Sequence, residues 1–253
     1  MMMKKNKKAY SPNMVFGING CLNVFKAKKL EIISVHLMAG GNADQNKTIN
    51  QQCNQFSQKV QRLNKKDFLN KYSGLRTQGI VVLFKGRLYK HIPDFSNVDS
   101  DFSLLILDNI EDPQNFGQII RTAECGGLNG IIIPQHNSVD LTNTAIQISQ
   151  GAFVHIPIYK CVNINRLIED LKKQGFWIIG FENSVNAKEW YNIDYNEKTV
   201  LIFGSEGRGI RKKTIEKCDF LATIPMQGNI SSLNVSASIS AVTFERLRQI
   251  KPL

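Results

Sequence analysis

The chain has 253 residues, 42% of them hydrophobic, and a formal net charge of +11 at pH 7. This length allows one large domain or two small ones, and no apolar run approaches the ~20 residues that cross a membrane. The basic start, MMMKKNKKAY, lacks the apolar core of a secretory signal. The five scattered cysteines, without a C-x-x-C pair, indicate reduced thiols in a cytoplasmic protein rather than disulfides or a zinc site. We therefore expect neither a metal nor a membrane partner.

Positive charge is concentrated in the front part of the chain. Residues 1–87 carry 16 Lys and Arg against three acids, a balance of +13, whereas residues 88–253 carry 16 bases and 18 acids, a balance of −2. Such a concentration is typical of proteins that bind a polyanion, with RNA or DNA the usual partner. The alternative is a lysine-rich surface that serves solubility alone.

The front part reads as a small α/β unit. Residues 1–13 are expected to form a disordered basic tail, and residues 14–87 an RNA-binding domain. The periodic apolar segment from Ile18 predicts a helix, followed by a strand at LEIISVHLM. The polar stretch GNADQNKTINQQCNQ predicts a loop leading into a second helix, and GIVVLF predicts a strand. Pro93 and a cluster of turn formers predict a linker over residues 88–101.

In residues 102–253, short apolar runs alternate with helical segments. The runs SLLILD, GIIIP, HIPIYKC, FWIIGF and TVLIFG predict strands, and the segments NFGQIIRTAECGG, LTNTAIQISQGAF and NINRLIEDLKKQG predict helices. Continuous apolar strands separated by helices predict an α/β fold with a parallel sheet covered on both faces. Ligands of such sheets bind beyond the carboxyl ends of the strands, which is where the unusual residues of this chain lie.

Two polar clusters follow predicted strands. In DPQNFGQIIRTAE, Asn115 lies at a loop-to-helix junction and Arg121 follows six positions later. Either these side chains are functional, or Asn115 caps the helix and Arg121 is an exposed helical base. In TVLIFGSEGRGIRKK, glycines directly after a strand let backbone amides approach a ligand closely. The glycine order matches neither a Walker loop nor a dinucleotide fingerprint.

The third cluster is IPMQGNISSLNVSASISAVTFERLRQ. Its alternation of small polar and apolar residues imitates a strand, but its length favours a helix from about Leu233. On a helix, Leu233, Ala237, Ala241 and Phe244 form one stripe, and Ser232, Ser236, Ser240 and Thr243 form a second. Small side chains such as these let another backbone approach closely.

The segments NFGQIIRTAE, LIFGSEGRG and IPMQGNISSLNVSAS, in this order, resemble the three signature motifs of the SpoU (TrmH-like) 2′-O-ribose RNA methyltransferases of the SPOUT superfamily. The resemblance covers the whole back domain. More loosely, the front domain resembles the L30e/L7Ae-like RNA-binding module that precedes the catalytic domain in some members. This arrangement is most similar to the bacterial subfamily that methylates a guanosine of 23S rRNA. tRNA-specific members usually lack the front module.

The resemblance implies a sheet whose C-terminal segment forms a deep trefoil knot, a homodimer, and S-adenosylmethionine bound in the knot. It places the cofactor at Gly204, Ile224, Met226, Gly228 and Leu233. It places catalytic or near-catalytic roles at Asn115, Arg121, Glu206, Ser232 and Asn234.

The chemistry implied by the family needs in-line alignment and a proton acceptor, and it needs no metal. The family proposal makes Arg121 that acceptor. Because a guanidinium is an extremely weak acid, we expect Arg121 instead to polarise the hydroxyl and hold the adjacent phosphate, with the proton leaving through water or phosphate and Glu206 fixing the guanidinium. Three alternatives stay open: tRNA as the substrate, a non-catalytic RNA-binding or ribosome-assembly protein, and a nicotinamide-dependent oxidoreductase.

Overall fold

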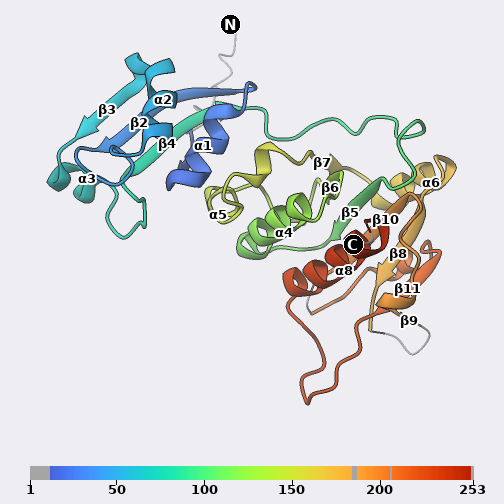
Figure 1. The fold of residues 1–253 in the computed structure, drawn as a ribbon. Coiled ribbons are helices and arrows are strands. Elements are labelled where there is room, and N and C mark those ends of the chain that lie inside the picture. Colours follow the sequence, from blue (N-terminus) through green and yellow to red (C-terminus); the bar gives the residue numbers. More distant parts are fainter. Residues whose placement is uncertain (1–11, 184–186, 206, 252–253) are drawn as a thin grey trace, which may run out of the picture. The chain divides into compact units, whose positions relative to one another are not determined.

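A computed structural model of the chain describes residues 12–183, 187–205 and 207–251 (Figure 1). The chain divides into two compact units, Met1–Arg87 and Leu88–Leu253, each built around its own sheet. Most of the expected basic tail, residues 1–11, lies outside the described residues. Within the described ranges no helix combines the length and the apolar character that crossing a membrane requires.

The described part of the first unit forms a four-stranded sheet in the order β1-β4-β2-β3. Strand β4 is antiparallel to both β1 and β2, and β3 is parallel to β2. The elements are β1 (Asn13–Phe16), α1 (Ile18–Lys26), β2 (Leu30–Met38), α2 (Lys47–Gln55), a 3₁₀ turn (Ser57–Lys59), β3 (Val60–Leu63), α3 (Lys65–Lys71) and β4 (Ile80–Gly86). The predicted helix from Ile18 and the predicted strands LEIISVHLM and GIVVLF are confirmed. The prediction of a loop over residues 41–55 is wrong in its second half, which forms α2, and the segment that follows forms β3 and α3. The short strand β1 comes in addition.

The helix α3 packs its apolar face on the sheet of the first unit. Phe68 and Tyr72 form a buried cluster with Val81 of β4. The Tyr72 hydroxyl bonds to Nδ1 of His36 on β2. Burial, together with the nearby charge of Lys71, holds the pKa of His36 below its ordinary value. The buried imidazole is therefore kept neutral and serves the packing of α3 rather than a surface charge.

Residues 88–101, expected to be a linker, pack on the second unit. The backbone N–H of Lys90 donates to the carbonyl of Ile158 over 2.9 Å, and that of Phe95 donates to Oε1 of Gln174 over 2.8 Å. The Phe95 ring is buried among the rings of Phe102, Tyr159 and Phe176. The buried Phe95 ring thus anchors this Pro-containing segment to the core of the second unit. The turn-forming residues predicted a linker and gave no sign of this packing.

In the described residues the second unit forms a seven-stranded sheet in the order β7-β6-β5-β10-β8-β11-β9, and every pairing in it is parallel. Its strands are β5 (Ser103–Asp108), β6 (Gly130–Pro134), β7 (Ile158–Cys161), β8 (Trp177–Phe181), β9 (Lys188–Glu189), β10 (Thr199–Gly204) and β11 (Phe220–Thr223). Its helices are α4 (Pro113–Cys125), α5 (Asn143–Ile148), α6 (Ile164–Lys173), α7 (Lys212–Ile215) and α8 (Val235–Ile250), with 3₁₀ turns at Ala152–Val154 and Trp190–Asn192. The prediction of an α/β fold with a parallel sheet is confirmed.

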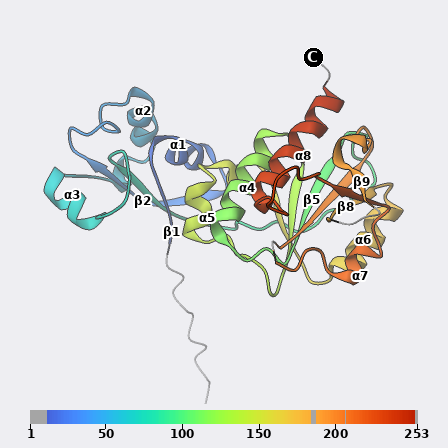
Figure 2. The same cartoon turned by 90° about the horizontal axis from the view of Figure 1, so that it is seen from below.

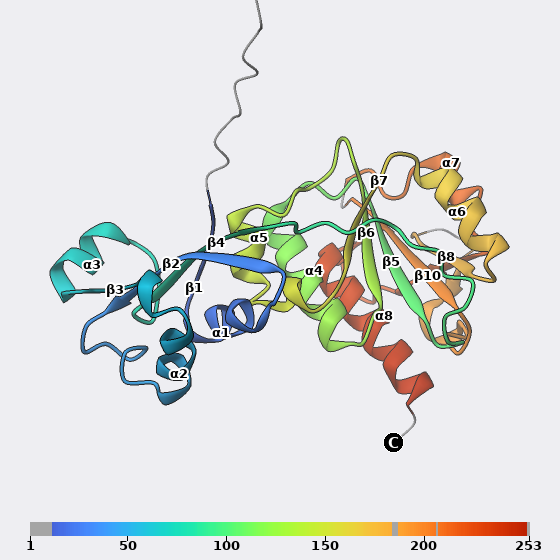
Figure 3. The same ribbon diagram turned by 90° about the horizontal axis from the view of Figure 1, so that it is seen from above.

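Helices cover both faces of this sheet. Helices α4, α5 and α8 lie on one face, and α6 and α7 lie on the other (Figures 2 and 3). The central strands β5 and β6 are buried along their whole length, in keeping with their continuous apolar sequences. In the pairing of β10 with β5, Thr199 lies opposite Ser103, and the buried hydroxyls of these two residues lie 2.8 Å apart. In this register Gly204 at the end of β10 lies beside Asp108 at the end of β5.

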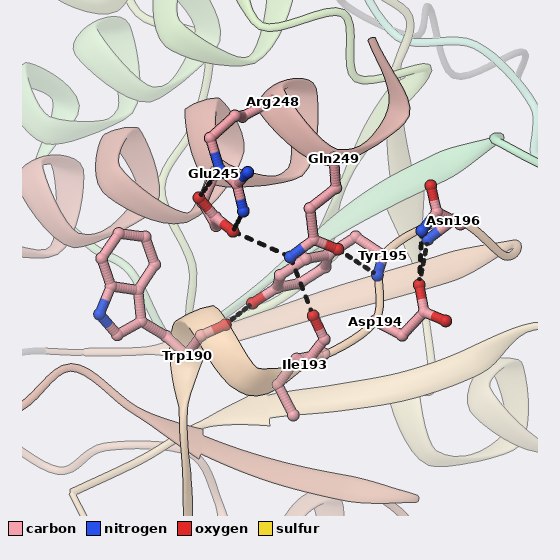
Figure 4. Close-up of polar contacts among 8 residues, drawn as sticks. All are labelled: Trp190, Ile193, Asp194, Tyr195, Asn196, Glu245, Arg248 and Gln249. Atoms are coloured by element: carbon pink, nitrogen blue, oxygen red, sulfur yellow. Dashed lines mark hydrogen bonds and ion pairs between the residues drawn. The ribbon is translucent and has the colours of Figure 1, made fainter. Parts of the chain in front are cut away.

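The helix predicted from about Leu233 is α8, which begins at Val235. Its far end is tied to the segment before β10 (Figure 4). The Gln249 side chain accepts from the backbone N–H of Tyr195 over 3.0 Å and donates to the carbonyl of Ile193 over 3.1 Å. Nε2 of Gln249 also donates to Glu245 over 2.9 Å. The last turns of α8 therefore anchor the helix and leave its first turn to face the carboxyl ends of the strands.

Candidate active site

The loop after β10 is held in a tight fold against the end of its own strand. Ser205 forms an isolated bridge with Gly209. A Cβ atom at Gly204 would lie 2.0 Å from the carbonyl carbon of Gly209, so no side chain fits there. Gly204 is therefore required by the close approach of two backbone segments.

Two carboxylates from neighbouring strand ends fix this loop. Asp108, fully buried at the end of β5, pairs with the Arg211 guanidinium at 2.6 Å and accepts from the Arg211 backbone N–H at 3.1 Å. Glu182, which follows β8, accepts from the backbone N–H of Ile210 at 3.0 Å. Hydrogen bonds to ionised groups are stronger than neutral ones, so these two carboxylates set the position of the loop.

A cavity of about 390 Å³, the strand-end cavity, lies beyond the ends of β8, β10 and β11. Its described lining includes Phe181, Glu182, Asn183, Phe203, Gly204, Ser205, Arg208, Thr223, Ile224, Met226, Ser231, Ser232, Leu233, Val235 and Ser238. Phe181 and Phe203 stack at a centroid distance of 4.3 Å. The stretch 224–234 runs out as a long loop between β11 and α8 (Figure 1). Residues far apart in the chain thus meet at one edge of the sheet.

Helix α4 begins at Pro113, and Asp112 is its N-cap. The Asp112 carboxylate accepts from the backbone N–H groups of Gln114 and Asn115 at 3.1 and 3.0 Å. The alternative in which Asn115 caps this helix is therefore wrong. Its amide is directed to a different partner, because the capping position is already occupied.

Asn115 meets the N-cap of α8. Nδ2 of Asn234 donates to Oδ1 of Asn115 over 2.9 Å, while Oδ1 of Asn234 caps α8 by accepting from the Ser236 backbone N–H over 2.9 Å. Asn115 lines a second cavity of about 290 Å³, the N-cap cavity, which also contains Asp112. The N-cap cavity and the strand-end cavity share Ser205, Gly207, Arg208 and Val235.

Arg121 is exposed two turns further along α4. It lines a third cavity, the α4–α8 cavity, together with Gln118, Thr122, Ile148, Asn234, Ser236, Ala237 and Ser240. No carboxylate is among these lining residues, and Arg121 makes no ion pair within the described residues. Among the described lining residues, Arg121 is therefore the one charged group of this cavity.

The residues singled out from the sequence divide among these cavities. Gly204, Ile224, Met226, Ser232 and Leu233 line the strand-end cavity. Asn115 lines the N-cap cavity and Arg121 and Asn234 the α4–α8 cavity, and the Asn115–Asn234 bond joins the two. Gly228 is exposed and lines none of the three, and Glu206 lies outside the described residues. Among the described side chains no group of three or more His, Cys, Asp or Glu is placed to hold a metal ion.

Sequence reasoning missed Asp108 and Glu182 as site residues. Both directly follow or end an apolar strand, and a carboxylate at such a position is the signal that would have marked them. Their partners, the backbone groups of residues 210 and 211, depend on strand order, which a single sequence does not give. Gln118 was missed because it lies inside a helix that looks amphipathic.

Comparisons with known proteins show the family of the chain. The model of the SpoU rRNA Methylase family matches residues 103–244. The 23S rRNA (guanosine-2'-O-)-methyltransferase RlmB of Shewanella oneidensis is 33% identical over 241 residues, covering 94% of this chain and 97% of that protein. The chain therefore belongs to the SpoU rRNA methylase family.

Solved structures show the same fold. The SpoU methyltransferase AviRb of Streptomyces viridochromogenes aligns with a TM-score of 0.78 at 19% identity, covering 95% of this chain and 90% of that one. An AdoMet-bound rRNA methyltransferase of Sinorhizobium meliloti aligns with a TM-score of 0.77 at 22% identity, covering 94% and 87%. At these identities the likeness to the two solved structures shows a shared fold alone.

The strand-end cavity suits S-adenosylmethionine in size and chemistry. Its volume lies in the range of small-ligand sites. The cofactor carries an ammonium, a carboxylate, ribose hydroxyls and an adenine. The described lining offers one carboxylate (Glu182), one guanidinium (Arg208), several hydroxyls and stacked aromatic rings. The donor and acceptor types present thus match those that the cofactor requires.

Proposed function

We propose that this protein transfers a methyl group from S-adenosylmethionine to the ribose 2′-hydroxyl of a guanosine in 23S rRNA. The observation that carries the proposal is the Asn115–Asn234 contact. It brings residues of the first and third family motifs together beside a cavity lined by the second. The likeness to a 23S rRNA (guanosine-2'-O-)-methyltransferase along 94% of the chain supports rRNA as the substrate.

The cofactor is held in the strand-end cavity by Gly204, Ile224, Met226 and Leu233, with Gly228 nearby. When bound, it supplies an electrophilic methyl group on a sulfonium, so the protein itself provides no leaving-group chemistry. The two carboxylates Asp108 and Glu182 keep the loop after β10 in place for the cofactor. The fixed backbone of this loop, rather than long side chains, defines the site.

The ribose is oriented and activated by side chains at the first turn of α8 and on α4. Arg121 holds the phosphate beside the target and polarises the 2′-hydroxyl, whose proton leaves to water or phosphate. A guanidinium keeps its own proton at neutral pH, so its role is electrostatic and geometric. Glu206, which the family resemblance implies as the partner of the guanidinium, lies outside the described residues. Asn115, Ser232 and Asn234 orient the reacting groups.

The second unit forms a deep trefoil knot. Support comes from the path of the chain: β10 is inserted between β5 and β8, and the stretch 224–234 returns to α8, which packs on α4. The first unit is an L30e/L7Ae-like RNA-binding domain. Its charge balance of +13 supplies the attraction to RNA phosphates.

The protein acts as a homodimer through the outer row of α8. Leu233 and Phe244 of that row are 45% and 49% exposed, and Ala237 lies exposed between them. An apolar row of this kind on a helix next to the site favours a second copy as its partner. An rRNA substrate implies a cytoplasmic location.

Transfer of labelled methyl groups to purified, unmodified 23S rRNA and to tRNA tests the function, followed by mapping of the modified nucleotide. We expect labelling of rRNA at a ribose 2′-hydroxyl. Labelling of tRNA alone would show that tRNA, and not 23S rRNA, is the substrate. Tight cofactor binding without transfer to any RNA would favour the non-catalytic alternative.

A further inference from the structure

A polar row on α4 pairs step by step with the small hydroxyl stripe of α8. Asn115 bonds to Asn234. Next, the Ser236 hydroxyl lies 2.7 Å from Oε1 of Gln118 and 2.5 Å from Oδ1 of Asn234, sharing its proton between two acceptors. Then the Thr122 hydroxyl lies 3.0 Å from that of Ser240. The row ends where Gly126 meets Thr243: a Cβ at Gly126 would lie 2.1 Å from Cγ2 of Thr243.

Gln118 differs from the other members of this row. Its side chain is exposed at the α4–α8 cavity, and its carbonyl oxygen is occupied by Ser236. Its Nε2 group has no acceptor among the described residues. An amide held by its oxygen presents its two N–H donors to the cavity, since these are the polar hydrogens left unused.

The neighbours of Gln118 determine which ligand those donors suit. Arg121, one turn further along α4, supplies the single charged group of the cavity, and the described lining holds no carboxylate. Guanidinium and amide donors without a competing acid form a site for an anion. In an RNA methyltransferase the anion at hand is a backbone phosphate of the substrate.

We propose that Gln118 is an RNA-binding residue that, together with Arg121, holds one backbone phosphate next to the methylated nucleotide. The inference rests on the proposed function and adds a contact that positions the ribose. Ser236 presets the rotamer of Gln118. The donors are thereby oriented before RNA arrives, and less side-chain entropy is lost on binding.

Three variants test the proposal. Gln118→Glu keeps an oxygen for the Ser236 hydroxyl but replaces the donors with a negative charge beside Arg121. Gln118→Ala removes the donors without adding charge. Gln135→Glu makes the same charge change at an exposed residue of the second unit that lines none of the three cavities. The measurements are KM for unmodified 23S rRNA, cofactor affinity by calorimetry, and the melting temperature.

We expect the KM for RNA to rise roughly tenfold in Gln118→Ala and on the order of 100-fold in Gln118→Glu, because a donor to a charged group is removed and then a repulsion is added. Cofactor affinity and melting temperature should stay at the wild-type values in Gln118→Glu, and Gln135→Glu should match the wild type throughout. A wild-type KM in Gln118→Glu overturns the proposal. A wild-type protein that methylates no RNA overturns the proposed function instead.

Discussion

Asn234 contacts Asn115 across 119 positions of sequence, and the same side chain caps α8. Its two amide ends therefore have separate tasks: the oxygen stabilises the helix, and the nitrogen reaches the first family motif. One substitution can separate these tasks, because aspartate keeps the oxygen and loses the donor.

We expect Asn234→Asp to retain α8, since an acidic side chain at a helix N-cap is favourable. It should slow methyl transfer, because the new carboxylate opposes Oδ1 of Asn115. Asn234→Ala removes both the cap and the donor, so it should slow methyl transfer and also lower the free energy of unfolding by about 1 kcal/mol. Chemical denaturation and single-turnover transfer measure the two effects. Full activity in Asn234→Asp would show that only the cap matters.

Substitution of Gly204 is expected to abolish cofactor binding through the loop. In Gly204→Ala the added Cβ would collide with Gly209, so the loop after β10 must move. Gly204→Val should act in the same way. Gln135→Ala is the control, at an exposed position of the second unit that lines none of the three cavities. Calorimetry with S-adenosylmethionine should show no measurable affinity for the first two variants and near wild-type affinity for the third. Unchanged affinity in Gly204→Val would remove this loop from the cofactor site.

Arg121 is exposed, so Arg121→Ala should change stability by no more than about 0.5 kcal/mol. Loss of a positioned electrostatic interaction should still reduce the transfer rate by roughly 10² to 10³ at saturating RNA, with cofactor affinity unchanged. Arg121→Lys keeps the charge without the planar fork. Rescue by lysine would indicate charge stabilisation, whereas no rescue would indicate a geometric clamp. A wild-type rate in Arg121→Ala would exclude Arg121 from the reaction.

Removal of residues 1–87 takes away the unit with a charge balance of +13. Cofactor binding should remain, because all three cavities are lined by residues of the second unit. RNA binding should weaken, and its dependence on salt should flatten by ~0.7 to 0.9 in logarithmic slope for each RNA phosphate that the protein no longer binds. Filter binding at several salt concentrations measures both. Equal RNA affinity before and after removal would contradict an RNA-binding role for the first unit.

The parts of the fold that could be predicted are those with a strong local signal. Strands such as β5 and β6 are continuous apolar runs, and α8 has two clear stripes. The short strand β3 and the edge strand β9 escaped prediction, because neither has an uninterrupted apolar run and backbone pairing with a neighbour supports each. Tertiary pairing outweighs local preference in such elements.

The candidate site was likewise only partly predictable from the sequence. Motif resemblance marked the residues at the first turn of α8, but the orientation of the two stripes needed the structure. The hydroxyl stripe packs on α4, whereas Leu233 and Phe244 of the apolar stripe are exposed. The buried face of α8 also includes the apolar Val235, Ile239 and Val242, so burial on this helix does not follow a single stripe. Small side chains occupy the buried face because α4 approaches closely at Gly126.

The first turn of α8 is a wall common to the strand-end cavity and the α4–α8 cavity, through the consecutive residues Leu233, Asn234, Val235 and Ser236. A ligand that orders this turn from one side also orders it for a ligand on the other side. With cofactor and RNA bound as proposed, the two would be thermodynamically linked, and the factor by which either raises the affinity of the other must be the same in both directions.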